Sequence, residues 1–456
     1  MRRVTTGSGP FARRGAGVLL HVSSLPAGRL GEDAYAFVDF LTAAGCSVWQ
    51  VLPLVPPDEE GSPYRALSAM ACHPGLLDPT VRVPPAWEAY RQWCERESDW
   101  LDPYVEYQTI RTSLGGTSWP DWEPTLRDRE PDRVAQVLRD APRLAERVRI
   151  QQWRFQQQWR ALREYAENRG VLLFGDLPIF VAHDSADVWG HRELFLLDET
   201  GYPLTVTGVP PDYFAVEGQR WNNPHYDWKA MAADDYRWWR RRVDRQRQLV
   251  DLVRIDHFRG FEAAWHVPVH AATAREGRWE PGPGVELVRR LVDTAGPGSL
   301  VAEDLGVITP AVERLRDDAG LPGMKVLQFA FDGDPDNPHL PSRHEQHAVV
   351  YTGTHDNDTT VGWWRALTDD SRALVRAELA DPSEPMPWAL IRLALSSPAR
   401  LAVVPAQDLL ALGSEARMNT PGVTEGNWSW RATSGAFSPA LAARLRELVE
   451  SMDRSG

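Results

Sequence analysis

Cysteine and long apolar runs are scarce in this sequence. Its 456 residues include only 3 cysteines, Cys46, Cys72 and Cys94, and no Cys-x-x-Cys pair. This usage predicts neither a disulfide framework nor a thiolate zinc site, and it favours a reducing compartment. No stretch reaches the roughly 18 uncharged apolar residues that a membrane span needs, and no apolar core of a signal peptide follows the basic N-terminus. We therefore expect a soluble, cytoplasmic protein that does not enter a membrane.

Positive charge is also in deficit. The 63 Asp and Glu residues outnumber the 50 Lys and Arg residues, which leaves a net charge of -13 at pH 7. A chain with this balance is a poor partner for nucleic acid or any other polyanion. The sequence also lacks a Gly-x-Ser-x-Gly elbow, a Walker loop and a Gly-x-Gly-x-x-Gly turn after a strand. Neither a serine nucleophile nor dinucleotide chemistry therefore has support.

Eight short apolar runs, each too brief for a helix, recur along the chain. Runs of this kind are typical of parallel strands that are buried on both faces of a sheet. Helical patterns lie between several of them, at 33–44, 309–319 and 371–380, and a further one ends the chain at 438–452. This alternation predicts an α/β fold, a (β/α)8 TIM barrel. The eight runs are 17–25, 47–54, 172–181, 249–258, 299–305, 324–331, 348–356 and 401–410.

Two of the connections are far longer than one crossover helix requires. We expect residues 1–456 to form a single catalytic barrel, with inserted, largely helical subdomains at 55–171 and 182–248. The first contains a polar, helix-forming stretch at 132–169. The second contains the loop 208–214, in which Pro and Gly surround adjacent aromatic residues. That composition fits a mobile flap over a groove and a packed surface loop equally well.

Carboxylates end three of the predicted strands, at the face where such a barrel carries its active site. These residues are Asp256, Glu303 and Asp356. Arg254 points the same way as Asp256 along its strand, so we expect it to keep that Asp ionised. A single acid at a strand end most often caps a helix or binds an Arg. Three together favour glycosidic-bond chemistry, in which one carboxyl is ionised and another protonated, with metal binding as the rival use.

Two further segments are the candidates for a metal site. Residues 332–337 lack the Gly and the distal Glu of an EF-hand loop and are more typical of a turn that contains Pro. His344 and His347 are three residues apart rather than four, which misses the zincin pattern, and we expect a solvated loop there. The 20 Trp residues suit a sugar-binding site, although most of them should serve in packing.

A series of long motifs, in a fixed order, covers nearly the whole chain. They lie at 61–64, 175–181, 184–189, 208–214, 219–221, 254–261, 302–306, 354–358, 407–410, 413–419 and 426–431. Together they resemble the motifs of the 4-alpha-glucanotransferases, or amylomaltases, of the alpha-amylase clan. The resemblance implies transfer of α-1,4-glucan segments between maltooligosaccharides or starch- and glycogen-like chains, with glucose as a further product. It also implies chemistry without a cofactor or metal, and a barrel without a C-terminal β-sandwich.

The resemblance also implies roles for particular residues. Asp256 is then the nucleophile that forms a covalent glucosyl-enzyme intermediate. Glu303 protonates the leaving oxygen and later deprotonates the incoming 4-hydroxyl, so that two inversions give net retention. Asp356 is similar to the family's third carboxylate, which grips sugar hydroxyls. The implied substrate-binding positions are Arg254, His355, Tyr64, Asp176, Asp212, Tyr213, Phe214, Gln219, Trp221 and Asn427.

Two features depart from the family's pattern. The segment 24–31 is shorter than the expected Gly-rich loop, and His73 stands where an Asn is usual. Both lie at the predicted barrel mouth, so they concern the donor subsites and the product spectrum rather than the chemistry. Two other functions stay open on the sequence: an α-1,4-glucan hydrolase on the same scaffold, and a non-catalytic glucan-binding protein.

Overall fold

Eight parallel strands form the central sheet of the computed structural model, which describes residues 11, 13–81, 86–211, 217–423 and 425–455. They are β1 (Gly15–Leu19), β2 (Val48–Gln50), β3 (Leu172–Pro178), β6 (Leu252–Asp256), β9 (Leu300–Ala302), β10 (Gly323–Val326), β11 (Ala348–Tyr351) and β12 (Leu401–Pro405). Their order is β10-β11-β12-β1-β2-β3-β6-β9. The N–H of Ala302 donates to the carbonyl of Pro322, just before β10, at 2.9 Å, so the sheet nearly closes on itself. The predicted barrel is confirmed, and each apolar run overlaps one strand.

Neighbouring residues of a barrel strand pack into different cores. In β12, Leu401 and Val403 belong to an apolar cluster built from residues of all eight strands, inside the barrel. Ala402 and Val404 belong to a larger cluster that includes the helices outside it. Both faces of the strand are therefore buried, which is why the strands appear in the sequence as unbroken apolar runs.

Helices cover the outside of the barrel. Two of those that were predicted begin in the same way: the side chains of Thr309 and Ser438 accept a backbone N–H in the first turn, and a Pro follows each of them. This is a favourable helix start, because Pro needs no hydrogen-bond partner at the first position. The outer helices are α1 (Glu32–Ala43), α10 (Gly284–Ala295), α11 (Pro310–Asp318), α12 (Thr360–Ala366), α13 (Asp369–Glu378), α14 (Trp388–Ser396), α15 (Ala406–Leu409) and α16 (Pro439–Ser451).

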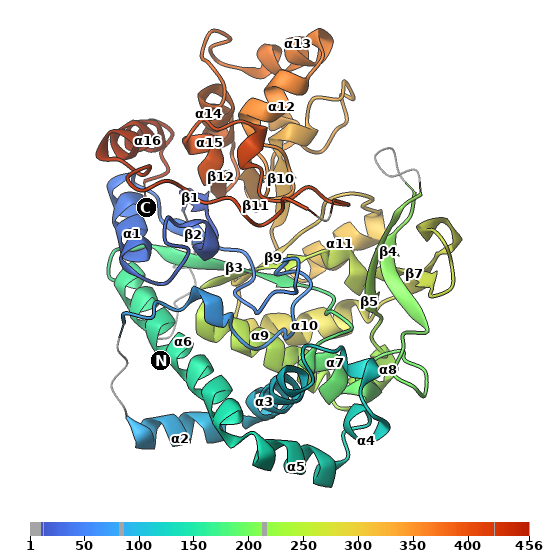
Figure 1. The fold of residues 1–456 in the computed structure, drawn as a ribbon. Coiled ribbons are helices and arrows are strands. Elements are labelled where there is room, and N and C mark those ends of the chain that lie inside the picture. Colours follow the sequence, from blue (N-terminus) through green and yellow to red (C-terminus); the bar gives the residue numbers. More distant parts are fainter. Residues whose placement is uncertain (1–10, 12, 82–85, 212–216, 424, 456) are drawn as a thin grey trace.

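The connection between β2 and β3 is helical in its described part. It contains α2 (Trp87–Arg96), α3 (Ser98–Ser113), α4 (Pro124–Arg127), α5 (Pro131–Asp140) and α6 (Pro142–Glu167). In Figure 1, α2 to α5 lie together below the barrel, and the long α6 leads from them back toward it. The stretch expected to be helical at 132–169 is divided at Ala141, because Pro142 begins a new helix there.

A second sheet, antiparallel and four-stranded, stands beside the barrel. Its order is β5-β4-β7-β8. The strands are β4 (Thr205–Val209), β5 (Gln219–Pro224), β7 (Ala263–Pro268) and β8 (Arg278–Pro281). The first two come from the connection after β3, together with α7 (Ala186–Gly190), α8 (Trp228–Ala233) and α9 (Arg237–Leu249); the other two come from the connection after β6. The sequence predicted largely helical insertions, and its local patterns did not indicate this sheet.

The described helices and the three cysteines bear on membrane insertion and on cross-linking. Among the described helices, none combines the length and the apolar character that crossing a bilayer demands. Cys46, Cys72 and Cys94 are all free thiols, and the first two are buried. The cysteines thus contribute to packing rather than to cross-links.

Candidate active site

Arg254 joins two carboxylates at the mouth of the barrel. It lies on β6, directly opposite Asp176 of β3. Its Nη1 is 2.7 Å from Asp176 Oδ2, and its Nη2 is 2.8 Å from Asp256 Oδ1. The hydroxyl of Tyr64 donates to the same Asp176 oxygen at 2.7 Å. The Asp176 side chain is fully buried, whereas 25% of the Asp256 side chain is exposed, so Asp256 is the carboxylate that the cleft can reach.

Glu303 lies against the residues that follow Asp256. Its Oε2 accepts the backbone N–H of His257 at 2.6 Å, and its Oε1 accepts that of Leu305 at 2.8 Å. The main chain is paired as well, since the Phe258 N–H donates to the Glu303 carbonyl at 3.1 Å. His257 makes this approach possible in a left-handed conformation, with φ of 52°. The structure thus brings Glu303 and Asp256 to one edge of the barrel.

Asp356 reaches the cleft from the loop after β11. Its side chain is 43% exposed, and its Oδ1 is 3.3 Å from His355 Nε2. The imidazole of His355 stacks on the ring of Tyr64, with centroids 5.0 Å apart and planes 10° apart. Trp428 packs beside both rings, at 5.6 and 5.9 Å. Aromatic contacts therefore connect Asp356 to the Tyr64, Asp176 and Arg254 group.

The electrostatics of the cleft favour keeping a proton among its carboxyls. Burial raises the pKa of Asp256; Arg254 lowers it, and the charges of Asp176, Glu303 and Asp356 raise it again. The net direction is upward, because burial and the neighbouring carboxylates outweigh the ion pair, which by itself favours the ionised form of Asp256. Burial is also the main cause of the raised pKa of Glu303. Closely placed acids that share protons are suited to general acid–base chemistry.

Two of the predicted sugar-binding residues lie on β5, near Glu303. The Trp221 Nε1 donates to the Gln219 side-chain oxygen at 3.2 Å. The Trp221 ring meets that of His257 edge to face, with centroids 4.8 Å apart. Since the His257 N–H binds Glu303, β5 borders the side of the cleft on which Glu303 lies. The flap residues Asp212, Tyr213 and Phe214 lie outside the described residues.

Asn427 is placed differently from the other predicted sugar contacts. Its side-chain oxygen accepts the Thr420 N–H at 2.8 Å, and its Nδ2 donates to the Val423 carbonyl at 2.8 Å. The amide therefore shapes the loop that carries Trp428. Sequence reasoning also missed Asn419, whose Nδ2 donates to Asp356 Oδ1 at 2.6 Å. Only its place in the motif 413–419 hinted at a role.

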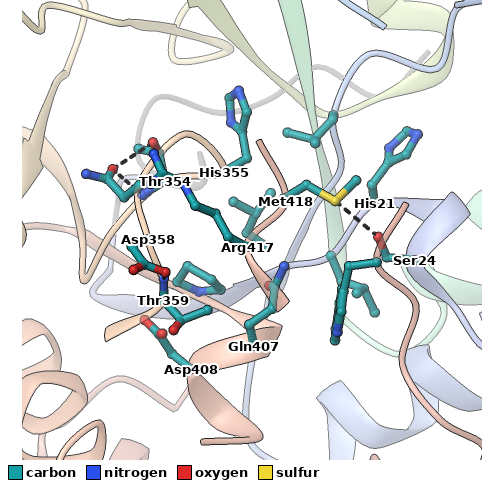
Figure 2. Close-up of a pocket in the computed structure, with 16 residues that line it drawn as sticks. His21, Ser24, Thr354, His355, Asp358, Thr359, Gln407, Asp408, Arg417 and Met418 are labelled. Atoms are coloured by element: carbon teal, nitrogen blue, oxygen red, sulfur yellow. Dashed lines mark hydrogen bonds between the residues drawn. The ribbon is translucent and has the colours of Figure 1, made fainter. Parts of the chain in front are cut away.

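Figure 2 shows the pocket that lies next to His355. Two acids line it, and both are held by short polar side chains. Asp358 accepts from the Ser414 hydroxyl at 2.7 Å. Asp408 accepts from the hydroxyls of Thr352 and Thr360, each at 2.7 Å. His21 also lines the pocket, and burial lowers its pKa to about 3, which keeps the ring neutral. Asp358 thus fastens its own loop to the segment around Ser414, and Asp408 fastens the end of β11 to the start of α12.

The remaining acidic and histidine candidates have structural partners. Asp304, next to Glu303, pairs with Arg316 and accepts the Met324 N–H at 2.7 Å, which fastens β9 to β10. The expected turn at 332–337 is formed: Asp332 accepts the N–H of Asp334 at 2.9 Å. His344 is buried, with Nδ1 2.8 Å from Ser397 Oγ and Nε2 2.9 Å from a carbonyl. Residues 345–347 are exposed and lie outside any helix or strand, as expected of a solvated loop, and only His344 departs from that expectation. In the described part of the chain, no three His, Cys, Asp or Glu side chains come together as metal ligands.

Comparison with known proteins finds extensive similarity. The model of the 4-alpha-glucanotransferase family matches residues 20–87 and 80–436. The 4-alpha-glucanotransferase of Thermus thermophilus is 46% identical, over 97% of this chain and 99% of its own length. The chloroplastic/amyloplastic 4-alpha-glucanotransferase of Arabidopsis thaliana is 41% identical, over 96% of this chain and 86% of its own length. Among solved structures, amylomaltase from Streptococcus agalactiae in complex with acarbose has a TM-score of 0.93 at 30% identity, covering 97% of this chain and 100% of that one.

Proposed function

The chain belongs to the 4-alpha-glucanotransferase family, and we propose that Asp256, Glu303 and Asp356 carry out its reaction by a retaining double displacement. The donor and the acceptor are α-1,4-glucans, from maltooligosaccharides to starch- and glycogen-like chains, and glucose is released or accepted at the chain end. The observation that carries the proposal is the junction at the barrel mouth. Arg254 binds Asp256 there, while Glu303 folds back onto the residue that follows Asp256.

The first displacement forms the intermediate. An Asp256 carboxylate oxygen attacks the anomeric carbon of the donor, and the bond from that carbon to the glycosidic oxygen breaks. Glu303 gives its proton to the departing oxygen, so the shortened glucan leaves as an alcohol. The configuration at the anomeric carbon inverts once. Asp356 holds hydroxyls of the same sugar and stabilises the oxocarbenium-like transition state.

The second displacement reverses these roles. The 4-hydroxyl of an acceptor sugar attacks the anomeric carbon, Glu303 takes the hydroxyl proton, and the bond to Asp256 breaks. A second inversion gives net retention. Retention also requires the two carboxyl groups to lie about 5–5.5 Å apart, with room for one sugar and no intervening water.

The reactive protonation state has Asp256 ionised and the proton on Glu303. Both groups have raised pKa values, so this arrangement competes with the reverse one. Asp256 has the guanidinium of Arg254 at 2.8 Å, whereas the described hydrogen bonds to the Glu303 carboxylate come from neutral backbone N–H groups, and the Arg254 charge acts on Glu303 from farther away. A full positive charge stabilises a carboxylate more than a neutral donor does, so the ion pair favours the reactive arrangement.

Transfer rather than hydrolysis depends on keeping water from the intermediate. We assign this role to the β5 border of the cleft, where Trp221 packs on His257, and, by the resemblance to the family, to the side chains of Tyr213 and Phe214. An α-1,4-glucan hydrolase would share every step up to the intermediate. The family match favours sugar as the acceptor.

Several wider features belong to the same proposal. The cleft binds acarbose, as the Streptococcus agalactiae amylomaltase does. Residues 55–171 and 182–248 act as insertions in a single catalytic unit and flank the site. The enzyme works in the cytoplasm, which the three free thiols support.

Incubation with maltotriose alone tests the proposal. The wild type should produce longer oligosaccharides and glucose while the total of reducing ends stays nearly constant. Asp256→Asn should lose this activity by a factor of about 10⁴ or more, since the nucleophile is gone. Asp318→Asn, an exposed change on α11, is the matched control and should behave as the wild type. Near-normal disproportionation by Asp256→Asn would refute the assignment of the nucleophile.

A further inference from the structure

Asp356 is held differently from the other two proposed catalytic carboxylates. Asp256 has an Arg partner, and Glu303 accepts two backbone N–H groups. Asp356 is the most exposed of the three, and the Nε2 of His355 lies 3.3 Å from its Oδ1. Burial lowers the pKa of His355, so this imidazole is neutral and does not pair with Asp356 as a charge. The shortest hydrogen bond to the Asp356 side chain comes from an amide: Asn419 Nδ2 donates to Asp356 Oδ1 at 2.6 Å. An exposed carboxylate on a loop has several rotamers available, so this contact decides where it points.

Asn419 is itself fixed on both sides. Its backbone N–H donates to the His355 carbonyl at 3.1 Å. The Arg417 side chain donates through Nε to the Asn419 carbonyl, at 2.8 Å, and through Nη2 to the Asp356 carbonyl. The Trp428 N–H donates to the Met418 carbonyl at 2.8 Å, which folds the segment back on itself. Figure 2 shows Arg417 and Met418 in the pocket wall beside His355.

The Asn419 side-chain amide can face the Asp356 carboxylate in only one way, with its NH2 group toward it. Toward an ionised carboxylate an amide can only donate, because its own oxygen would be repelled. Oδ1 of Asp356 is engaged by Asn419 and faces His355, and no described residue donates to Oδ2, so Oδ2 can accept sugar hydroxyls.

On the basis of the function proposed above, we propose that Asn419 is a positioning residue, which acts on the reaction through Asp356 without touching the substrate itself. Hydrogen bonds to charged groups contribute enough free energy to change rates by about 10- to 100-fold. Asn419→Ala should therefore lower kcat for maltotriose by about 10- to 100-fold, and KM should change much less. Asn419→Asp places a second carboxyl beside Asp356, and the repulsion within this pair should move the acid limb of the pH profile to higher pH.

A double-mutant cycle tests the route of the effect. The rate of maltotriose disproportionation is measured for Asn419→Ala, Asp356→Asn and the double variant. If Asn419 acts through Asp356, its substitution should have little further effect once Asp356 is Asn. Multiplicative losses in the double variant would overturn the inference. So would wild-type kcat and pH profile in both Asn419 variants.

Control variants distinguish a positioning role of Asn419 from a loss of folding and from a failure of the proposed mechanism. Thr420→Ala changes the neighbouring residue and leaves every contact of Asp356 intact, so it should retain wild-type kcat and pH profile. Thermal unfolding of each variant shows whether it is folded, and Asn419→Asp keeps the size of the side chain. If Asp356→Asn is fully active, the proposed mechanism fails. If Asp356→Asn is impaired and Asn419→Ala is not, only the positioning role fails.

Discussion

Replacing Arg254 by Met should destabilise the protein in a pH-dependent way. The guanidinium is buried between Asp176, which has no exposed surface, and Asp256, which is one quarter exposed. Removing one partner of a buried ion pair typically costs about 3–5 kcal/mol, because the other charge is left without compensation. Two carboxylates lose their partner here. Asp256 can still be hydrated in part, so we expect Arg254→Met to lower the free energy of unfolding near neutral pH by about 3–5 kcal/mol, and not by twice that amount.

The pH dependence follows from the sign of the pKa shifts. Without Arg254, the pKa of Asp256 in the folded state should rise further above its unfolded value of about 3.9. A group whose folded pKa is raised stabilises the protein below the unfolded pKa, and this stability is lost as pH rises through the folded pKa. The variant should therefore be closest to the wild type in acid. Since the folded pKa of wild-type Asp256 is itself about 8, both proteins keep this proton at lower pH, and the gap should widen only as pH rises through about 8.

Urea unfolding at about pH 6.5 and about pH 9.5, on either side of that pKa, measures both effects. Arg254→Lys is the matched control: it keeps the charge but cannot contact both carboxylates in the same way, so its loss should be smaller. An Arg254→Met variant as stable as the wild type at about pH 9.5 would refute the reasoning. A loss of stability that is the same at both pH values would show that packing, and not charge, is responsible.

Two further predictions concern Glu303 and the closure of the barrel. Burial raises the pKa of Glu303, and the acid step needs its proton, so wild-type kcat/KM for maltotriose should fall as pH rises through this raised pKa. Glu303→Gln should be about 10²–10⁴ times slower, and its pH–rate profile should lack this fall at alkaline pH. A pH–rate profile checks this, and an alkaline limb that persists in Glu303→Gln would contradict it. Arg316→Met should leave Asp304 buried without its ion pair at the junction of β9 and β10, and should lower stability by about 3–5 kcal/mol. Thermal unfolding beside the exposed control Arg314→Met checks this, and equal melting temperatures would count against a role in closing the barrel.

The barrel could be predicted because its strands have no polar face. Leu401 and Val403 face the interior while Ala402 and Val404 face the helices, so the run is apolar throughout. The ends of the strands were less predictable. The runs continue past the last paired residue, since the loops at the barrel mouth are also buried, and the structure therefore shows shorter strands than expected.

The antiparallel sheet could not be recognised in the same way. β5 (Gln219–Pro224) consists mostly of polar residues. Its neighbour β4 also pairs with β7, which comes after the barrel strand β6 in the chain. Pairing between distant segments leaves no local periodicity. The burial of His344 was equally hidden, because Ser397, which binds its ring, lies far along the chain.

Within the candidate site, the sequence could indicate residue types more readily than their partners. The alternation of side chains along a strand was enough to place Arg254 beside Asp256. It could not show that the burial of Asp256 outweighs the ion pair, because burial depends on the surrounding loops. Nor could it show that Asn419 binds Asp356, since an Asn in a polar loop is as typical of a turn as of a functional contact.

Trapping the covalent intermediate tests the proposed mechanism most directly. Glu303→Gln can still form the glucosyl-enzyme from an α-glycosyl fluoride, whose leaving group needs little acid assistance, but it lacks the base that activates an acceptor. Rapid quenching, proteolysis and mass spectrometry then locate the adduct. We predict a glycosyl ester on the peptide that contains Asp256. An adduct on another residue, or none while the fluoride donor is still consumed, would contradict a double displacement through Asp256.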